Sequence, residues 1–358
     1  MKRRWKVLLG VAGGLAALAA VPIVYIEAGC RGDTAEAGSS RQPLISDKAW
    51  QREEARTWLT YPEWHIVYSA ESFGRFLERN PPSGYSYLRD IRGFWSSYCA
   101  VNRASAASGG ADGGTRVMLY TIGLSFSAEL LVKGFYENTI GRVSEWIGGW
   151  DSADDRYATR VQQRYGAFMH ETPWYEFPFG RAFSGLWSTT EPKHKVRHWE
   201  RRLALSGEYG VKAGYASLIG WASGASLGRD ERTLRFVAKG NPEQIARVDG
   251  RLKPVGKVGA GNTLVEAPRY AQFSDLLTKL SQSPVQLVEI SGNDDIFVTA
   301  LVPIKGKPAT GATQLMAMPL PDRPGWQRVG LSTKVPALLP LLRSIRSSGG
   351  EIEHVYDY

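Results

Sequence analysis

Hydrophobic and polar residues follow three different patterns along the chain. Four basic residues within the first six positions precede an uncharged stretch at 7–26. From 47 to about 226, apolar residues return every three or four positions, which is the period of amphipathic helices. After 229, apolar and polar residues alternate, which is the period of strands. The pattern predicts an apolar leader, a helical part and a part that contains strands.

The leader is long enough to cross the ~30 Å hydrocarbon core of a bilayer as one helix. Because Lys and Arg prefer the cytoplasmic side, we expect everything after Cys30 to lie outside the cytoplasm. A cleaved signal sequence is the alternative, since Ala17-Leu18-Ala19 is an acceptable small-residue cleavage site. We favour the anchor, because the apolar run continues to Ile26, beyond the ~7 to 15 residues of a signal core. Glu27, where lipoproteins carry an aliphatic residue, argues against lipidation of Cys30.

These patterns divide the chain into four segments. Residues 1–30 form the membrane anchor or signal segment, and 31–46 form a tether of small and polar residues without fixed structure. Residues 47–228 form an all-helical domain, and 229–358 form an α+β domain. The expected helices of the helical domain lie at 47–60, 63–79, 85–104, 115–147, 153–171 and 193–226, with prolines between several of them.

The α+β domain contains a pattern that repeats at an offset of 65 residues. The matching apolar positions are Leu276, Leu277, Leu280, Leu287 and Ile290 in the first set and Leu341, Leu342, Ile345, Ile352 and Val355 in the second. Each set is typical of a helix leading into a strand, with further strands expected at 233–239, 261–266, 295–303 and within 314–331. We predict two β-β-α-β units in one antiparallel or mixed sheet with its two helices on one face, of ferredoxin-like character. Chance similarity of two amphipathic helix–strand pairs is the alternative.

Charge and cysteine content narrow the range of partners. The formal net charge is +9, but four of the 44 basic residues lie in the leader, so the rest of the chain has 40 against 35 acidic residues. This modest excess argues against a nucleic-acid partner and for contact with anionic lipid headgroups. With two cysteines, a multi-thiolate metal site is excluded. In an exported chain we expect Cys30 and Cys99 to form a disulfide rather than two unpaired thiols.

The segment 61–68, YPEWHIVY, contains the first chemical candidates. Glu63 and His65 are suited to acid-base work or to metal ligation. Residues two apart on a helix point to different faces, so the two would converge only in an irregular first turn after Pro62. We favour the structural interpretation, in which Pro62 and Glu63 begin a helix and Trp64 packs in the core.

Two further candidates are pairs of opposite charges at helical spacing. Glu129, Lys133 and Glu137 lie in one predicted helix, and Glu208 and Lys212 lie in another. If buried, these groups would form a desolvated charge network, which is a common property of functional sites. If exposed, they are ordinary helix ladders worth ~0.2 to 0.5 kcal/mol per pair. We favour the ladders.

The last candidates are two histidines in a basic segment. His194 and His198 are four residues apart, a spacing that lets two imidazoles face one metal ion on a helix. Five neighbouring cationic residues would repel such an ion, so we favour a solvated basic helix end that touches lipid phosphates beside Trp199. The sequence contains no nucleophile elbow, phosphate-binding loop or dinucleotide fingerprint, and we expect no cofactor.

Four segments together resemble a bacterial family of single-pass membrane proteins without an assigned activity. They are YPEWHIVY at 61–68, FWSSYC at 94–99, YTIGLSF at 120–126 and EISGND at 289–294. The resemblance implies an anchored protein of the bacterial inner membrane with its C-terminal part in the periplasm. It supplies no catalytic residues.

The expected function is therefore noncatalytic. The helical domain holds ten of the twelve tryptophans, and aromatic side chains are enriched in binding surfaces and at membrane interfaces. We expect a scaffold or interaction protein that contacts the bilayer through residues 7–26 and another envelope protein. The alternative is an enzyme or a carrier of a hydrophobic ligand with a charged pocket in the helical domain. A large enclosed cavity holding the charged candidates would favour this alternative.

Overall fold

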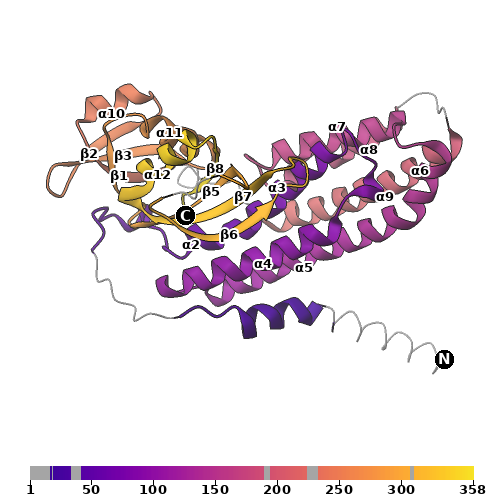
Figure 1. Cartoon of the computed structure of the whole chain (residues 1–358), viewed down its shortest axis with the longest axis horizontal. Helices are drawn as coiled ribbons and strands as arrows, with labels where there is room; N and C mark the ends of the chain where they lie inside the picture. The colour runs from indigo at the N-terminus through magenta and orange to yellow at the C-terminus, as the bar shows by residue number, and fades with distance from the viewer. Residues whose placement is uncertain (1–16, 18, 34–41, 189–193, 224–232, 307–309) are drawn as a thin grey trace.

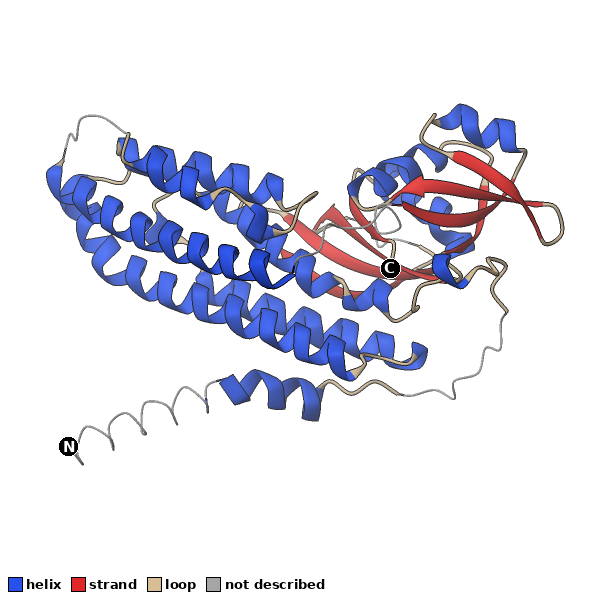
Figure 2. Cartoon of the chain, turned by 180° about the vertical axis from the view of Figure 1, so that it is seen from behind, coloured by secondary structure: helices blue, strands red, loops and turns tan. Residues whose placement is uncertain are grey.

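The computed structural model describes residues 17, 19–33, 42–188, 194–223, 233–306 and 310–358, and it is elongated (Figure 1). Helices form one end and two sheets form the other. The leader prediction, residues 7–26, falls largely outside the described residues. Its described end is helical at Ala19–Gly29 and lies along α5(Gly113–Tyr136) in both views (Figures 1 and 2).

The helical part has long helices where the sequence predicts them. They are α3(Tyr61–Phe76), α4(Tyr87–Ser105), α5, α6(Arg142–Gly148), α7(Ala153–Phe168) and α9(Lys195–Ser223), with a short α8(Phe179–Leu186) that the prediction missed. A wider helical turn, Glu137–Gly141, joins α5 directly to α6. A capping box formed by Ser152 and Asp155 begins α7.

The predicted helix at 47–60 is wrong. This segment contains a single 3-10 turn, Lys48–Trp50, and a one-turn helix, α2(Arg56–Leu59). Between them the backbone is extended at Gln51, and the Arg52 N–H donates to the Ser291 carbonyl at 2.9 Å. The segment therefore consists of two short helical turns with local hydrogen bonds, and between them the backbone of Arg52 pairs with the sheet part.

The structure is α+β, but the prediction of one sheet is wrong because there are two antiparallel four-stranded sheets (Figure 2). The first, with strand order β2-β3-β1-β4, contains β1(Thr233–Lys239), β2(Lys253–Val258), β3(Asn262–Pro268) and β4(Gln286–Ile290). The second, with order β6-β7-β5-β8, contains β5(Asp295–Pro303), β6(Thr313–Pro319), β7(Trp326–Lys334) and β8(Glu351–Tyr356). The helices are α10(Pro242–Val248), α11(Ala271–Leu280) and α12(Val335–Ser347).

The two sheets have equivalent strand orders, as the 65-residue offset suggests. In each, the third strand leads through a helix into the fourth strand, which pairs with the first. Each helix packs against both sheets, since α12 contacts β4 as well as strands of its own sheet, and α11 contacts β8 as well as β3. Leu277 and Leu342, equivalent under the offset, are both fully buried in one core shared by the two sheets. The two units therefore stabilise each other through this common core.

The second sheet also shares a core with the helices. Phe297 of β5 and Tyr356 of β8 pack in the same buried cluster as Tyr61 and Tyr68 of α3. The Thr57 hydroxyl donates to the Tyr356 carbonyl at 2.8 Å and accepts from the Phe297 N–H at 2.9 Å. These contacts fix the helical part against the second sheet.

Candidate functional site

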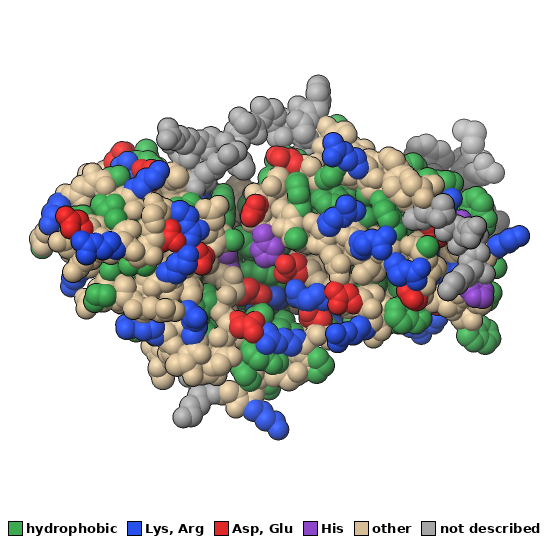
Figure 3. Space-filling view, turned by 90° about the horizontal axis from the view of Figure 1, so that it is seen from above, with side chains coloured by type: hydrophobic (Ala, Val, Ile, Leu, Met, Phe, Trp, Pro, Cys, Tyr) green, Lys and Arg blue, Asp and Glu red, His purple; other side chains and the backbone are tan. Residues whose placement is uncertain are grey.

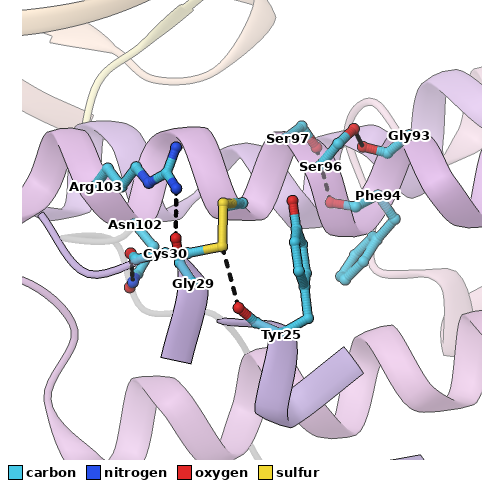
Figure 4. Close-up of a disulfide and its surroundings, with 10 residues drawn as sticks. Tyr25, Gly29, Cys30, Gly93, Phe94, Ser96, Ser97, Asn102 and Arg103 are labelled. Carbon is cyan, nitrogen blue, oxygen red and sulfur yellow. Dashed lines mark hydrogen bonds between the residues drawn. A yellow bond between two sulfur atoms is a disulfide. The ribbon is translucent and has the colours of Figure 1, made fainter. Parts of the chain in front are cut away.

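A disulfide joins the end of the leader to the folded body (Figure 4). It links Cys30 to Cys99 of α4, the pair expected from the sequence, across a sequence separation of 69. The Asn102 side chain donates to the Cys30 carbonyl at 2.9 Å, and Arg103 donates to the Gly29 carbonyl. The end of the leader is thus bound to α4 covalently and by hydrogen bonds.

The same end of the leader is also bound to α5. The Glu27 carboxylate accepts a hydrogen bond from the Tyr120 hydroxyl at 2.6 Å and lies 3.4 Å from the Arg116 guanidinium. Ile26 is buried in the helical core. Helix Ala19–Gly29 is therefore held at a fixed position beside α4 and α5 rather than on a free tether.

A network of charges lies between α5 and α9. The Lys133 ammonium donates to both Glu208 oxygens, at 2.9 and 3.1 Å. The Lys212 ammonium lies 2.7 Å from Glu129 and 3.3 Å from Glu208. The ladder interpretation is wrong for α5, because Glu129, Lys133 and Glu137 pair with α9 rather than along their own helix. Glu208 and Lys212 do pair along α9, but both side chains are mostly buried and belong to the same network, so they are not an exposed ladder either.

The network continues toward the start of α9. Arg201 donates to both oxygens of Glu137 at 2.9 Å, and both side chains are buried. Arg197, with no exposed surface, donates to the two oxygens of Asp155 at 2.6 and 3.2 Å. Each guanidinium therefore forms a two-pronged pair with a carboxylate from a neighbouring helix.

The solvated basic helix end predicted around His194 and His198 is wrong for most of this segment. His198 is buried, and its Nδ1 lies 2.6 Å from an Asp154 carboxylate oxygen. His194 is exposed just before the first turn of α9. The two imidazoles therefore occupy different environments, and the i, i+4 spacing does not give a shared metal site.

The charge network borders a small cavity. Lys133, Glu137, Asp155, Arg201 and Glu208 contribute to its wall, together with apolar side chains of α3, α7 and α9. Its volume is about 40 Å³. This is room for a few water molecules, whereas drug-sized ligands need pockets of ~300–1,000 Å³. This cavity is smaller than the large enclosed cavity that would favour the enzyme or carrier alternative.

Glu63 and His65 point apart, as their spacing on a helix predicts. Glu63 is exposed in the first turn of α3. His65 is buried, with Nε2 at 3.1 Å from the Asp90 carbonyl and with no partner for Nδ1 among the described residues. Burial lowers the pKa of His65 to about 4, so the imidazole is neutral. The two side chains do not share a proton or a ligand.

A polar cluster that sequence reasoning missed lies between α3 and the second sheet. Arg328 of β7 forms a two-pronged pair with Glu353 of β8, with both hydrogen bonds at 2.6 Å. The guanidinium also lies over the Tyr68 ring, 4.1 Å from its centroid. Alternation in the sequence gives no signal for this pair, because β7 and β8 lie on either side of β5 and the register between β5 and β8 shifts at Glu353.

Two histidines whose pKa values are shifted in opposite directions flank this cluster. The His354 ring lies 3.9 Å from the Trp64 ring, centroid to centroid, and burial lowers the pKa of His354 to about 3. The His170 Nε2 lies 2.7 Å from a Glu71 carboxylate oxygen, and this hydrogen bond raises the pKa of His170. The cluster thus combines one neutral and one readily protonated imidazole.

One set of carboxylates in the described part of the chain has metal-ligand spacing, namely Glu54, Asp294 and Asp295. The Glu54 carboxylate accepts from the backbone N–H groups of Asp294 and Asp295, at 3.3 and 3.1 Å. The Lys334 ammonium lies 2.7 Å from Asp295. The backbone donors and the Lys334 ammonium hold Glu54 and Asp295 in place, which fits a structural turn.

No protein-family model, curated protein sequence or solved structure matches this chain significantly.

Proposed function

We propose that this chain is a membrane-anchored protein of the bacterial envelope, with its folded body outside the cytoplasm and a noncatalytic role as a scaffold or interaction module. One observation carries the proposal: the Cys30–Cys99 disulfide closes on the end of an apolar leader. Disulfides form and persist in oxidising compartments, and the basic start of the leader favours the cytoplasmic side. Residues 7–26 are then the transmembrane anchor.

The noncatalytic part of the proposal rests on the state of the charged side chains. Lys133, Arg197 and Arg201 are each paired with carboxylates of the same chain. The adjoining cavity is too small for a substrate. Charges that neutralise one another inside a bundle support a structural role for these residues.

The sheet part fits a scaffold of two ferredoxin-like units in this proposal. In the first unit the element order is β1, α10, β2, β3, α11, β4, and the strands are arranged 4-1-3-2 with antiparallel neighbours. In the second unit the strand arrangement is the same, but no helix is described between β5 and β6.

Thiol labelling of the full chain in bacterial spheroplasts tests the location. With a membrane-impermeant maleimide, we expect no labelling before reduction. After treatment with an impermeant reductant, we expect labelling of Cys30 and Cys99. The labelled protein should stay in the membrane pellet after extraction with alkaline carbonate. Labelling only after cell lysis would refute the location, and labelling without reduction would refute the disulfide on which the proposal rests. Native mass spectrometry of the full chain tests the noncatalytic role, and a stoichiometric small molecule on the purified protein would overturn it.

A further inference from the structure

A long apolar surface of the described structure runs along α5 and α6. Together with the turn between them, these helices form one continuous helix, Gly113–Gly148, of 36 residues. Its outward face carries Val117, Val132, Phe135, Ile140, Val143 and Trp146, each more than half exposed. We call these six residues the α5–α6 face. Apolar patches of this length on a folded protein normally contact another apolar phase.

The α5–α6 face is almost free of charge. Between Arg116 and Arg142, all of whose residues the structure describes, Glu129 is the one exposed ionisable side chain, and it is paired with Lys212 at 2.7 Å. At 1.5 Å per residue, the stretch between the two arginines is ~37 Å long. This exceeds the ~30 Å thickness of the hydrocarbon core of a bilayer.

Two ordinary explanations for an apolar helix do not apply to α5 and α6. A core helix of a soluble protein would be mostly buried, but only 22% of the most apolar stretch of this helix is buried. A leader would lie at the N-terminus, whereas this helix begins at Gly113 in the middle of the fold. Its composition therefore indicates a contact that the described residues do not supply.

We propose that the α5–α6 face lies against the hydrocarbon of the same bilayer that holds the leader, so that the helical body is embedded and not only tethered. The proposal rests on the proposed anchoring of residues 7–26. Helix Ala19–Gly29 lies along α5 and is fixed to its first turns through Glu27, Arg116 and Tyr120 (Figures 1 and 2). Lipid around the leader therefore also meets α5.

The two ends and the opposite side of the bundle agree with this placement. Trp146, 90% exposed, and Arg142 lie at the far end of the α5–α6 face, and Trp and Arg are typical of membrane–water interfaces. On the α7 side, which Figure 3 shows from above, acidic and basic side chains are interspersed. Arg156, Arg160 and Arg164 of α7 are exposed. The bundle thus has one side suited to lipid and one suited to water.

Three matched substitutions test the proposal on the full chain, because Ala20, Ala128 and Ala167 are all exposed alanines on helices. Ala20→Cys reports on the leader, Ala128→Cys on α5 and Ala167→Cys on the α7 side. With Cys30 and Cys99 bridged, each variant has one free thiol for an environment-sensitive fluorophore. The labelled proteins are reconstituted in phosphatidylcholine–phosphatidylglycerol vesicles with and without brominated acyl chains.

We expect brominated lipid to quench the probes at 20 and 128 to a similar extent and to leave the probe at 167 unchanged. Quenching at 20 alone would overturn the lipid contact of α5 and leave the anchor standing. Quenching at 128 alone would support the contact and overturn the anchor, and quenching at neither would overturn both. A probe at 128 that neither brominated lipid nor aqueous iodide quenches would show that a protein, such as a second copy, covers this face, and would overturn the proposal.

Discussion

Replacing His354 with Phe should remove a defined part of the pH dependence of stability. The His354 ring is 2% exposed, lies 3.9 Å from the Trp64 ring and meets the Tyr356 ring edge-on at 4.8 Å between centroids. A Phe ring keeps both contacts without a titrating group. The His354 Nδ1 also lies 3.5 Å from the Ser274 hydroxyl, a contact that Phe does not make, while the Val355 N–H can still donate to the Ser274 oxygen at 2.8 Å.

The magnitude follows from the pKa of His354, which burial, and secondarily the charge of His170, lower from 6.5 to about 3. Below pH 6.5 the unfolded chain binds a proton that the folded chain does not bind, so the folded state loses stability as pH falls toward about 3. The loss is ~1.4 kcal/mol per pH unit, or about 2 kcal/mol between pH 6.5 and pH 5. At pH 7.5, where His354 is neutral in both states, the substitution should change the free energy of unfolding by less than about 1.5 kcal/mol.

Urea unfolding of the full chain in a mild detergent, followed by tryptophan fluorescence at pH 7.5, 6 and 5, measures this difference. The wild type should lose about 2 kcal/mol more than His354→Phe over this range. His170, whose pKa is raised by Glu71, contributes with the opposite sign in both proteins and cancels. His194→Gln, at an exposed imidazole, should keep the wild-type pH dependence and is the matched control. Equal slopes for the wild type and His354→Phe would refute the reasoning.

Further substitutions test three other parts of the structure by the same unfolding measurement at pH 7.5. Arg328→Met should lower the free energy of unfolding by about 3–5 kcal/mol, because it leaves the partly buried Glu353 carboxylate without its partner. Adding Glu353→Leu should restore most of this loss. A double variant no more stable than Arg328→Met would contradict this account. Cys99→Ser should lower the free energy of unfolding by about 2–4 kcal/mol, and a reductant should bring the wild type to the same value but leave the variant unchanged. Leu277→Ala and Leu342→Ala should each lower the free energy of unfolding by about 3 kcal/mol, since both side chains are fully buried at equivalent positions. A negligible change for either variant would show that the two units do not share a core.

Local patterns predicted much of the fold because helix and strand periods depend on neighbouring residues. The long helices α3, α4, α5, α7 and α9, and the helix–strand pairs at the 65-residue offset, all lie close to their predicted positions. The prediction for 47–60 failed because the backbone N–H and carbonyl of Arg52 form hydrogen bonds with Ser291 and Asn293, about 240 positions away, which interrupts a continuous helix. Likewise, the number of sheets depends on which strand edges pair, and alternation within a strand does not specify this.

The candidate side chains show the same division. The sequence by itself determined that His65 and Glu63 point apart, since helix geometry separates residues two positions apart. It also limited any disulfide to Cys30 and Cys99, because there are no other cysteines. Only the tertiary structure decided that Lys133 pairs with Glu208 and not along its own helix, because burial and ion pairing depend on which helices pack together. The exposure of the α5–α6 face was decided in the same way, since an apolar stretch has the same sequence whether it meets a protein core or remains uncovered.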